Sequence, residues 1–135
     1  MSIKVELDAI ATEMASRPVS YLVTAGDDGP PHLGAAVFRL VDGALVAGAG
    51  RTTRRHVASR SVVSCLWAPA EVGGYSLIVD GDAIITGEGD GAAIHITPTW
   101  AVLHRPAGDQ AAADSGAAND TADCSQDCQP LAERS

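Results

Sequence analysis

Six apolar segments rich in β-branched residues, separated by glycine, proline and aspartate, fill most of the sequence between residues 19 and 105. The turns between them carry strong local signals, such as residues 26–31 and the Asp42-Gly43 pair, because these residue types accept the backbone conformations of tight turns. Consecutive strands joined by short turns pair antiparallel. The pattern therefore predicts strands at residues 19–25, 32–40, 44–49, 62–67, 75–86 and 92–105.

Two helices are expected beside these strands. Residues 7–14 carry apolar side chains at helical spacing, and Pro18 ends that segment. Residues 51–60 are polar, basic and compatible with a helix. Gly81 lies within the long strand 75–86 and predicts a bend of the kind that barrels use at corners. The predicted fold class is mainly β (α+β): a six-stranded antiparallel barrel with an N-terminal helix and a short helix between strands three and four.

Composition separates a folded region from a tail. The chain has 135 residues, of which 46% are hydrophobic and 19% charged, enough for the core of one domain. Residues 106–135 contain six acidic side chains against one arginine and almost no large apolar side chain, so they cannot bury enough surface to offset chain entropy. We expect a folded domain over residues 1–105 and a disordered, acidic, alanine-rich tail with two cysteines over residues 106–135.

Charge and hydropathy exclude several functions. The net charge of −8 argues against a nucleic-acid partner bound through its phosphates. No apolar run is long enough for a membrane span, and the first residues do not resemble a signal peptide, so we expect a cytoplasmic protein without a membrane partner. One lysine against eight arginines, with abundant alanine and glycine, indicates a GC-rich bacterial genome.

The segment after the third predicted strand is the strongest candidate for a site. Four of the nine basic side chains fall within residues 51–60 of an otherwise acidic chain. Guanidinium groups, threonine hydroxyls and the amides of a helix start together form an anion pocket for which phosphate is the natural ligand. The alternative is a solvated helix face whose arginines pair with surface acids. The candidate ligands are Arg51, Thr52, Thr53, Arg54 and Arg55.

Other reactive side chains form no recognised motif. The histidines and acids lack the spacing of zinc sites or of a nucleophilic triad, so no metal is expected. Cys65 lies inside an apolar run and is interpreted as a small buried hydrophobe. Cys124 and Cys128, in the tail, are expected to form a flexible, redox-accessible pair rather than a metal site.

In order and spacing, these segments resemble the pyridoxamine 5′-phosphate oxidase-like family, the flavin-binding split β-barrels. The resemblance covers about residues 5–105 and rests on the stretches YLVTAGDDGPPH, from Tyr21 to His32, and RTTRRHVASRSVVSCLW, from Arg51 to Trp67. The Asp-Gly hairpin that leads into a glycine-rich strand end also agrees with it. GGYSLIVDG and TPTWAVLHRP look like a short, uncharacterised bacterial subgroup.

The resemblance implies a homodimer with FMN, or the deazaflavin F420, in a groove at the dimer interface. It places the cofactor phosphate at the five candidate ligands named above, with His56 standing where the family has asparagine. It also implies that His32 approaches the flavin ring and that Trp67 stacks at the groove. The alternatives are a histidine that satisfies a turn and a tryptophan that fills the core or the interface.

The predicted function is an FMN-binding oxidoreductase that acts on a small-molecule substrate of unknown identity. One alternative is an F420-dependent reductase of the same fold. Another is a non-catalytic split-barrel module that has lost its cofactor, which is favoured by His56 in the asparagine place and by the absence of the longer C-terminal region of the true oxidases. No residue is assigned as the catalytic acid or base.

Overall fold

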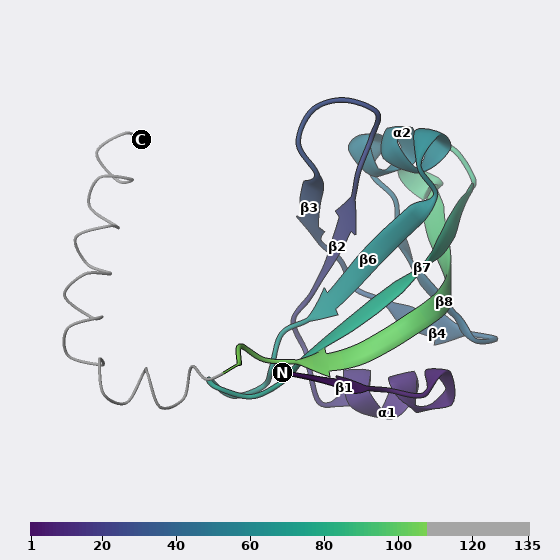
Figure 1. Ribbon diagram of the computed structural model, residues 1–135. Coiled ribbons are helices and arrows are strands. Elements are labelled where there is room, and N and C mark those ends of the chain that lie inside the picture. Colours follow the sequence, from purple (N-terminus) through teal and green to yellow (C-terminus); the bar gives the residue numbers. More distant parts are fainter. Residues whose placement is uncertain (108–135) are drawn as a thin grey trace. The chain divides into compact units, whose positions relative to one another are not determined.

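The structure is a computed structural model that describes residues 1–107. Within it, Ser2–Arg105 forms one compact unit, built from antiparallel strands and short helices (Figure 1). The helical elements are η1 (Leu7–Ala9), α1 (Ile10–Ala15), α2 (Arg51–Ser59) and η2 (Gly89–Gly91). The strands are β1 (Ser2–Lys4), β2 (Ser20–Thr24), β3 (His32–Ala35), β4 (Arg39–Val41), β5 (Ala44–Gly48), β6 (Val62–Trp67), β7 (Ser76–Thr86) and β8 (Ala93–His104).

The strands pair in the order β3-β2-β6-β7-β8-β5-β4, and β1 pairs with the last residues of β8. β3 and β4 therefore lie at opposite ends of the pairing path, although only residues 36–38 separate them along the chain. Because so short a link spans roughly 14 Å at most, the sheet must curl until its two ends approach each other. This curl, visible in Figure 1, produces the mainly β split barrel that the sequence predicts.

The prediction of six strands is wrong in number, because the structure has eight within the described residues. The segment 32–40 divides into β3, which pairs with β2, and β4, which pairs with β5. Between them Phe38 turns into the core and packs on Trp67, with 5.2 Å between ring centroids. An apolar corner of this kind has the same composition as a continuous strand, so local pattern does not reveal it.

Strand β1 was also missed, because its three side chains are all exposed and give no alternating pattern. It forms because β8 is much longer than its neighbour β5. β5 pairs with β8 only as far as Ile96, which leaves the far end of the same edge available. Ser2, Ile3 and Lys4 pair there with residues 102–104.

Two local predictions are confirmed. Asp42 and Gly43 both have positive φ, 50° and 83°, as a tight two-residue hairpin between β4 and β5 requires. At Gly81 the register between β7 and β8 shifts. A Cβ at Gly81 would lie 2.5 Å from the carbonyl oxygen of Thr97, so the close approach of two backbones at this bend requires glycine.

The inward side chains of the curled sheet form a single core. The expectation for Cys65 is confirmed, since it is fully buried there as a free thiol. Burial, and to a smaller extent the charge of Asp80, raises the pKa of the Cys65 thiol to about 12, so this thiol stays protonated at neutral pH. The core residues of the strands that are at most 4% exposed are Leu22, Leu45, Val63, Cys65, Trp67, Leu77, Val79, Ala83, Ile94, Ile96 and Ala101.

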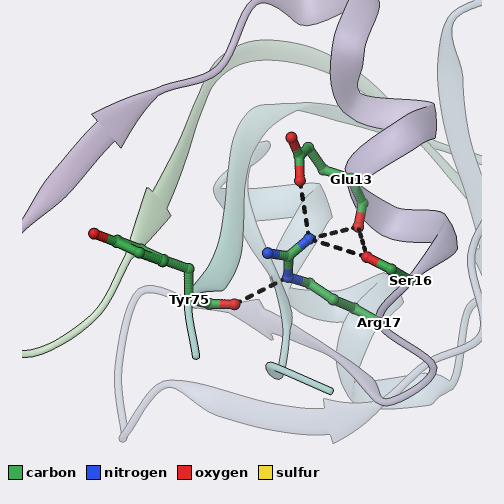
Figure 2. Close-up of polar contacts among 4 residues, drawn as sticks. All are labelled: Glu13, Ser16, Arg17 and Tyr75. Atoms are coloured by element: carbon green, nitrogen blue, oxygen red, sulfur yellow. Dashed lines mark hydrogen bonds and ion pairs between the residues drawn. The ribbon is translucent and has the colours of Figure 1, made fainter. Parts of the chain in front are cut away.

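The predicted N-terminal helix is present as η1 followed by α1, and Arg17 attaches its end to the sheet (Figure 2). Arg17 Nη1 donates to the carbonyl oxygen of Glu13 at 2.7 Å and to its carboxylate at 3.1 Å. Arg17 Nε donates to the carbonyl oxygen of Tyr75 at 3.0 Å. The bonds of Arg17 therefore fix the end of α1 to the start of β7. The Arg105 guanidinium also lies over the Tyr75 ring, 4.6 Å from its centroid.

The described residues include no helix with the length and hydropathy of a membrane span.

Candidate functional site

Helix α2 begins where β5 leaves the sheet. The amide of Ala49 still donates to the carbonyl oxygen of Ala92, at 3.0 Å. Gly50 is the N-cap residue in an extended conformation, and no side chain caps the helix. The first amides of a helix have no partner within it, and they carry the positive end of the helix dipole. The amides of residues 51–53 are therefore hydrogen-bond donors that no capping side chain covers.

A pocket of about 360 Å³ lies at this point, and we call it the α2-start pocket. Arg54 joins its two walls, since Nη1 donates to the carbonyl oxygens of Ala49, at 2.8 Å, and Gly89, at 3.1 Å. A Cβ at Gly48, Gly50 or Gly89 would have no neighbouring atom within 4 Å, so the missing side chains leave open space. The pocket is lined by Gly48, Ala49, Gly50, Arg51, Arg54, Gly89 and Asp90.

A second pocket, of about 350 Å³, lies between α2 and the loop that follows β2, and we call it the His56 pocket. His56 is only 5% exposed. Its Nδ1 lies 3.0 Å from Oγ1 of Thr24, which is 1% exposed. The ring of His32 meets the His56 ring edge to face, with 6.2 Å between centroids. The pocket is lined by Gly26, Asp27, Asp28, Arg55, His56 and Ser59.

The structure divides the predicted anion ligands between the two pockets. Arg51 and Arg54 line the α2-start pocket, whereas Arg55 lines the His56 pocket. Neighbouring residues of a helix point about 100° apart, which places Arg54 and Arg55 on different sides of α2. Thr53 is buried against the core, and Thr52 lines neither pocket. Among residues 1–107 no arginine of α2 forms an ion pair, which weakens the interpretation of a solvated face paired with acids.

The two other predicted ligands lie away from the start of α2. His32 contacts the ring of His56 and so lies beside the His56 pocket. Trp67 is 2% exposed and packs on Phe38 at the end of β6 farthest from α2. This burial favours the alternative in which Trp67 fills the core.

Sequence reasoning missed the pocket residues that lie far from α2 along the chain. The contacts that bring them to the helix span long stretches of chain: 32 positions from Thr24 to His56 and 35 from Arg54 to Gly89. No local pattern can show such contacts. The one available signal was Gly26, which does not have a positive φ. A Cβ at Gly26 would lie 2.8 Å from Cδ2 of His56, so this glycine is required by space and not by the turn.

Within the described part of the chain, no group of three or more histidine, cysteine, aspartate or glutamate side chains could hold a metal ion. Cys124 and Cys128, and nearly all of the predicted tail, lie outside the described residues. The two pockets offer guanidinium groups, backbone amides, one fixed imidazole and the carboxylates of Asp27, Asp28 and Asp90.

No model of a known protein family matches the chain. Two mycobacterial proteins are similar in sequence, Uncharacterized protein Mb0449c of Mycobacterium bovis and Uncharacterized protein MT0457 of Mycobacterium tuberculosis. Each is 37% identical over 120 residues, which cover 77% of this chain and 82% of the relative.

Three solved structures illustrate the structural similarity. A Listeria innocua protein whose name proposes a pyridoxamine 5′-phosphate oxidase has a TM-score of 0.58 and 20% identity, over 72% of this chain and 96% of its own. An FAD binding protein from Mycobacterium smegmatis has a TM-score of 0.56 and 16% identity, over 78% and 100%. HutZ, a heme storage protein from Vibrio cholerae, has a TM-score of 0.53 and 13% identity, over 73% and 94%.

This curled antiparallel sheet, matched along nearly the full length of these structures, has the fold of the pyridoxamine 5′-phosphate oxidase-like split β-barrel proteins. Within that class, the chain belongs to the same family as the mycobacterial proteins Mb0449c and MT0457. The names of its structural neighbours cover both flavin and heme binding, so the ligand must be argued from the site.

Proposed function

We propose that this protein is an oxidoreductase that binds a flavin nucleotide, FMN, and that the α2-start pocket holds the phosphate end of the cofactor. The observation that carries the proposal is the convergence of Arg51, Arg54 and the uncapped start of α2 on one open pocket. Two guanidinium groups face a single carboxylate, that of Asp90, so the lining favours an anion. No histidine lines this pocket, so it offers no imidazole ligand to a heme iron.

The two arginines have different tasks in this proposal. Arg54 uses Nη1 to hold the η2 turn against the start of α2, and its Nε and Nη2 make no hydrogen bond with the described residues. Arg51 is exposed and makes no hydrogen bond within residues 1–107, so its whole guanidinium fork is available for the ligand. Arg54 thus holds the two walls of the α2-start pocket together, and the exposed guanidinium of Arg51 supplies most of the positive charge that can adjust its position to the ligand.

The glycines of the pocket fit a bound phosphate. Side chains at Gly48, Gly50 and Gly89 would project into open space, the space that a phosphate needs in order to reach the backbone amides. A bound flavin supplies hydride and electron transfer, and the chain supplies binding, orientation and exclusion of water.

We also propose that the protein is a homodimer. Tyr21, Leu66, Ile78 and Val102 are register partners across β2, β6, β7 and β8, and they lie on the face opposite to the buried core residues of those strands. Leu33, on β3, is exposed beside them. A contiguous apolar face of this kind is typical of a protein–protein interface.

Titration with FMN and with riboflavin tests the cofactor proposal, because riboflavin has the same ring without the phosphate. We expect FMN to bind at least tenfold more tightly, and Arg51→Ala to remove most of that difference. Arg60→Ala is the matched control, since Arg60 is exposed at the other end of α2 and lines neither pocket.

Equal affinities for FMN and riboflavin would contradict the phosphate site. Parallel titrations decide among the alternatives. Tighter binding of F420 than of FMN supports the deazaflavin reductase, and binding of neither supports the module without a cofactor. Tighter binding of hemin than of any flavin would mean that the cofactor is heme.

Light scattering after gel filtration tests the homodimer. Leu66→Glu places a carboxylate in the apolar row and is expected to give a monomer. Val72→Glu is the control, because Val72 is fully exposed in the loop between β6 and β7. A wild-type monomer at micromolar concentration would contradict the dimer.

A further inference from the structure

We propose that the His56 pocket is a second binding site, for a small zwitterion of the size of an amino acid, separate from the flavin site. The first observation is that the imidazole is held in place. His56 is 5% exposed, and its Nδ1 shares a hydrogen bond of 3.0 Å with the buried hydroxyl of Thr24. Burial of both groups is tolerable because each satisfies the other.

The second observation is that the opposite nitrogen of the same ring has no partner. Nε2 of His56 makes no hydrogen bond with any described residue. Every fully buried side-chain nitrogen or oxygen of the described residues has a partner, so Nε2 must be reachable from outside the core. The His56 pocket, which His56 lines, provides that access.

The third observation is that the backbone of Gly26 packs closely on one edge of the His56 ring. A Cβ at Gly26 would lie 2.8 Å from Cδ2 and 3.1 Å from Nε2 of His56. Because Gly26 does not adopt a positive φ, the backbone itself does not demand glycine there. Glycine at this position therefore lets the loop after β2 approach the ring, and the same loop brings Asp27 and Asp28 to the rim of the His56 pocket.

The charged groups of the rim define the class of ligand. Asp27 and Asp28 come from the loop after β2, and Arg55 comes from α2, so carboxylates and a guanidinium face the pocket from different elements. The carboxylates disfavour a simple anion and Arg55 disfavours a simple cation, whereas an ammonium and a carboxylate on one molecule satisfy both. Nε2 supplies one further hydrogen bond to the ligand.

Size and donors agree with this assignment. A volume of about 350 Å³ is at the small end of ligand pockets. The hydroxyl of Ser59 already donates to the carbonyl oxygen of His56 at 3.1 Å, so it is not counted as a donor for the ligand. A metal ion is not the ligand, because no set of three suitable side chains converges within the described residues.

The test uses the full chain without added flavin and follows the ring resonances of its histidines by NMR. The probes are pools of the twenty standard L-amino acids at up to about 10 mM. We expect at least one pool to shift the His56 ring resonance in a saturable way. The amine and the acid that each lack one charge of the active amino acid should bind at least tenfold more weakly.

Arg55→Ala is expected to weaken binding at least fivefold, because it removes the partner of the ligand carboxylate, and Arg60→Ala is expected to leave it unchanged. Gly26→Ala should also weaken binding, because its methyl group displaces either the His56 ring or the loop that carries Asp27 and Asp28. If that variant does not fold, the exposed Arg55 still decides the question. No saturable shift with any pool, or an unchanged affinity in Arg55→Ala, would overturn the proposal. Displacement of the amino acid by FMN would overturn the separation of the two sites.

Discussion

The two pockets beside α2 have almost the same volume, about 360 Å³ and 350 Å³, but different chemical groups line them. The α2-start pocket is made mainly of backbone, three glycines and two arginines at its edge. The His56 pocket has a floor of one buried imidazole, fixed by a buried hydroxyl. A pocket lined by backbone donors discriminates among ligands mainly by their charge. A fixed side chain also requires a ligand atom at a defined position. One helix of nine residues therefore supports two kinds of recognition.

The largest expected difference between the pockets is in stability. His56→Ala should lower the free energy of unfolding by about 2–4 kcal/mol, because it leaves a cavity and an unpaired Thr24 hydroxyl. Arg51→Ala, in the other pocket, should change it by less than about 0.5 kcal/mol, because Arg51 is exposed. Urea unfolding followed by circular dichroism measures both, and similar losses would show that the pockets do not differ in this way.

Two glycines offer the next comparison. Gly26→Ala should destabilise the fold by about 1–3 kcal/mol, because the new methyl group collides with the His56 ring. In Gly50→Ala the new methyl group would lie in open space. Only the weaker N-cap preference of alanine destabilises this variant, so its loss of unfolding free energy should stay below about 1 kcal/mol. Thermal unfolding of both variants gives the order, and a reversed order would mean that the ring of His56 moves aside freely.

A third comparison uses affinity for FMN. Arg51→Ala should weaken binding about tenfold, or about 1.4 kcal/mol, because a guanidinium–phosphate contact is lost. Arg55→Ala removes the same charge one turn later in the helix, and its effect should stay within about twofold. Flavin fluorescence titration at fixed ionic strength measures both values. An equal effect of Arg55→Ala would show that the phosphate lies on the His56 side of α2.

At neutral pH the smallest effect concerns Cys65, which belongs to neither pocket and serves as a reference. Its pKa is raised to about 12 in the folded state, whereas the unfolded thiol titrates near 8.5. The contribution of the neutral thiol to stability is therefore complete below about pH 8.5 and is lost as the pH rises toward 12. In a Cys124→Ser/Cys128→Ser background, Cys65 should react with a thiol reagent at pH 8 only as fast as the protein unfolds. Rapid labelling of the folded protein would contradict its burial.

Local chemistry made part of this structure predictable. The Asp42-Gly43 hairpin, the bend at Gly81 and the helix after β5 each depend on a few neighbouring residues, and each is present. The corner at Phe38 was not predictable, because it depends on the packing of that ring against Trp67.

The site was predictable only in α2 and in the residues just before it. The basic segment identified α2, but a count of arginines along the chain does not say which way they point, and the structure separates Arg54 from Arg55. The other halves of both pockets come from elements that reach α2 through the tertiary fold. Gly89 contacts Arg54 and Thr24 contacts His56 because of the order in which the strands pair.

Strand β1 contributes three exposed side chains and adds little to the core. Its backbone, however, covers the edge of β8 at residues 102–104. A chain that begins at residue 5 would keep its buried side chains and its pockets, but it would present a row of unpaired amides and carbonyls to other molecules. The expected defect of such a truncation is aggregation of an otherwise folded protein.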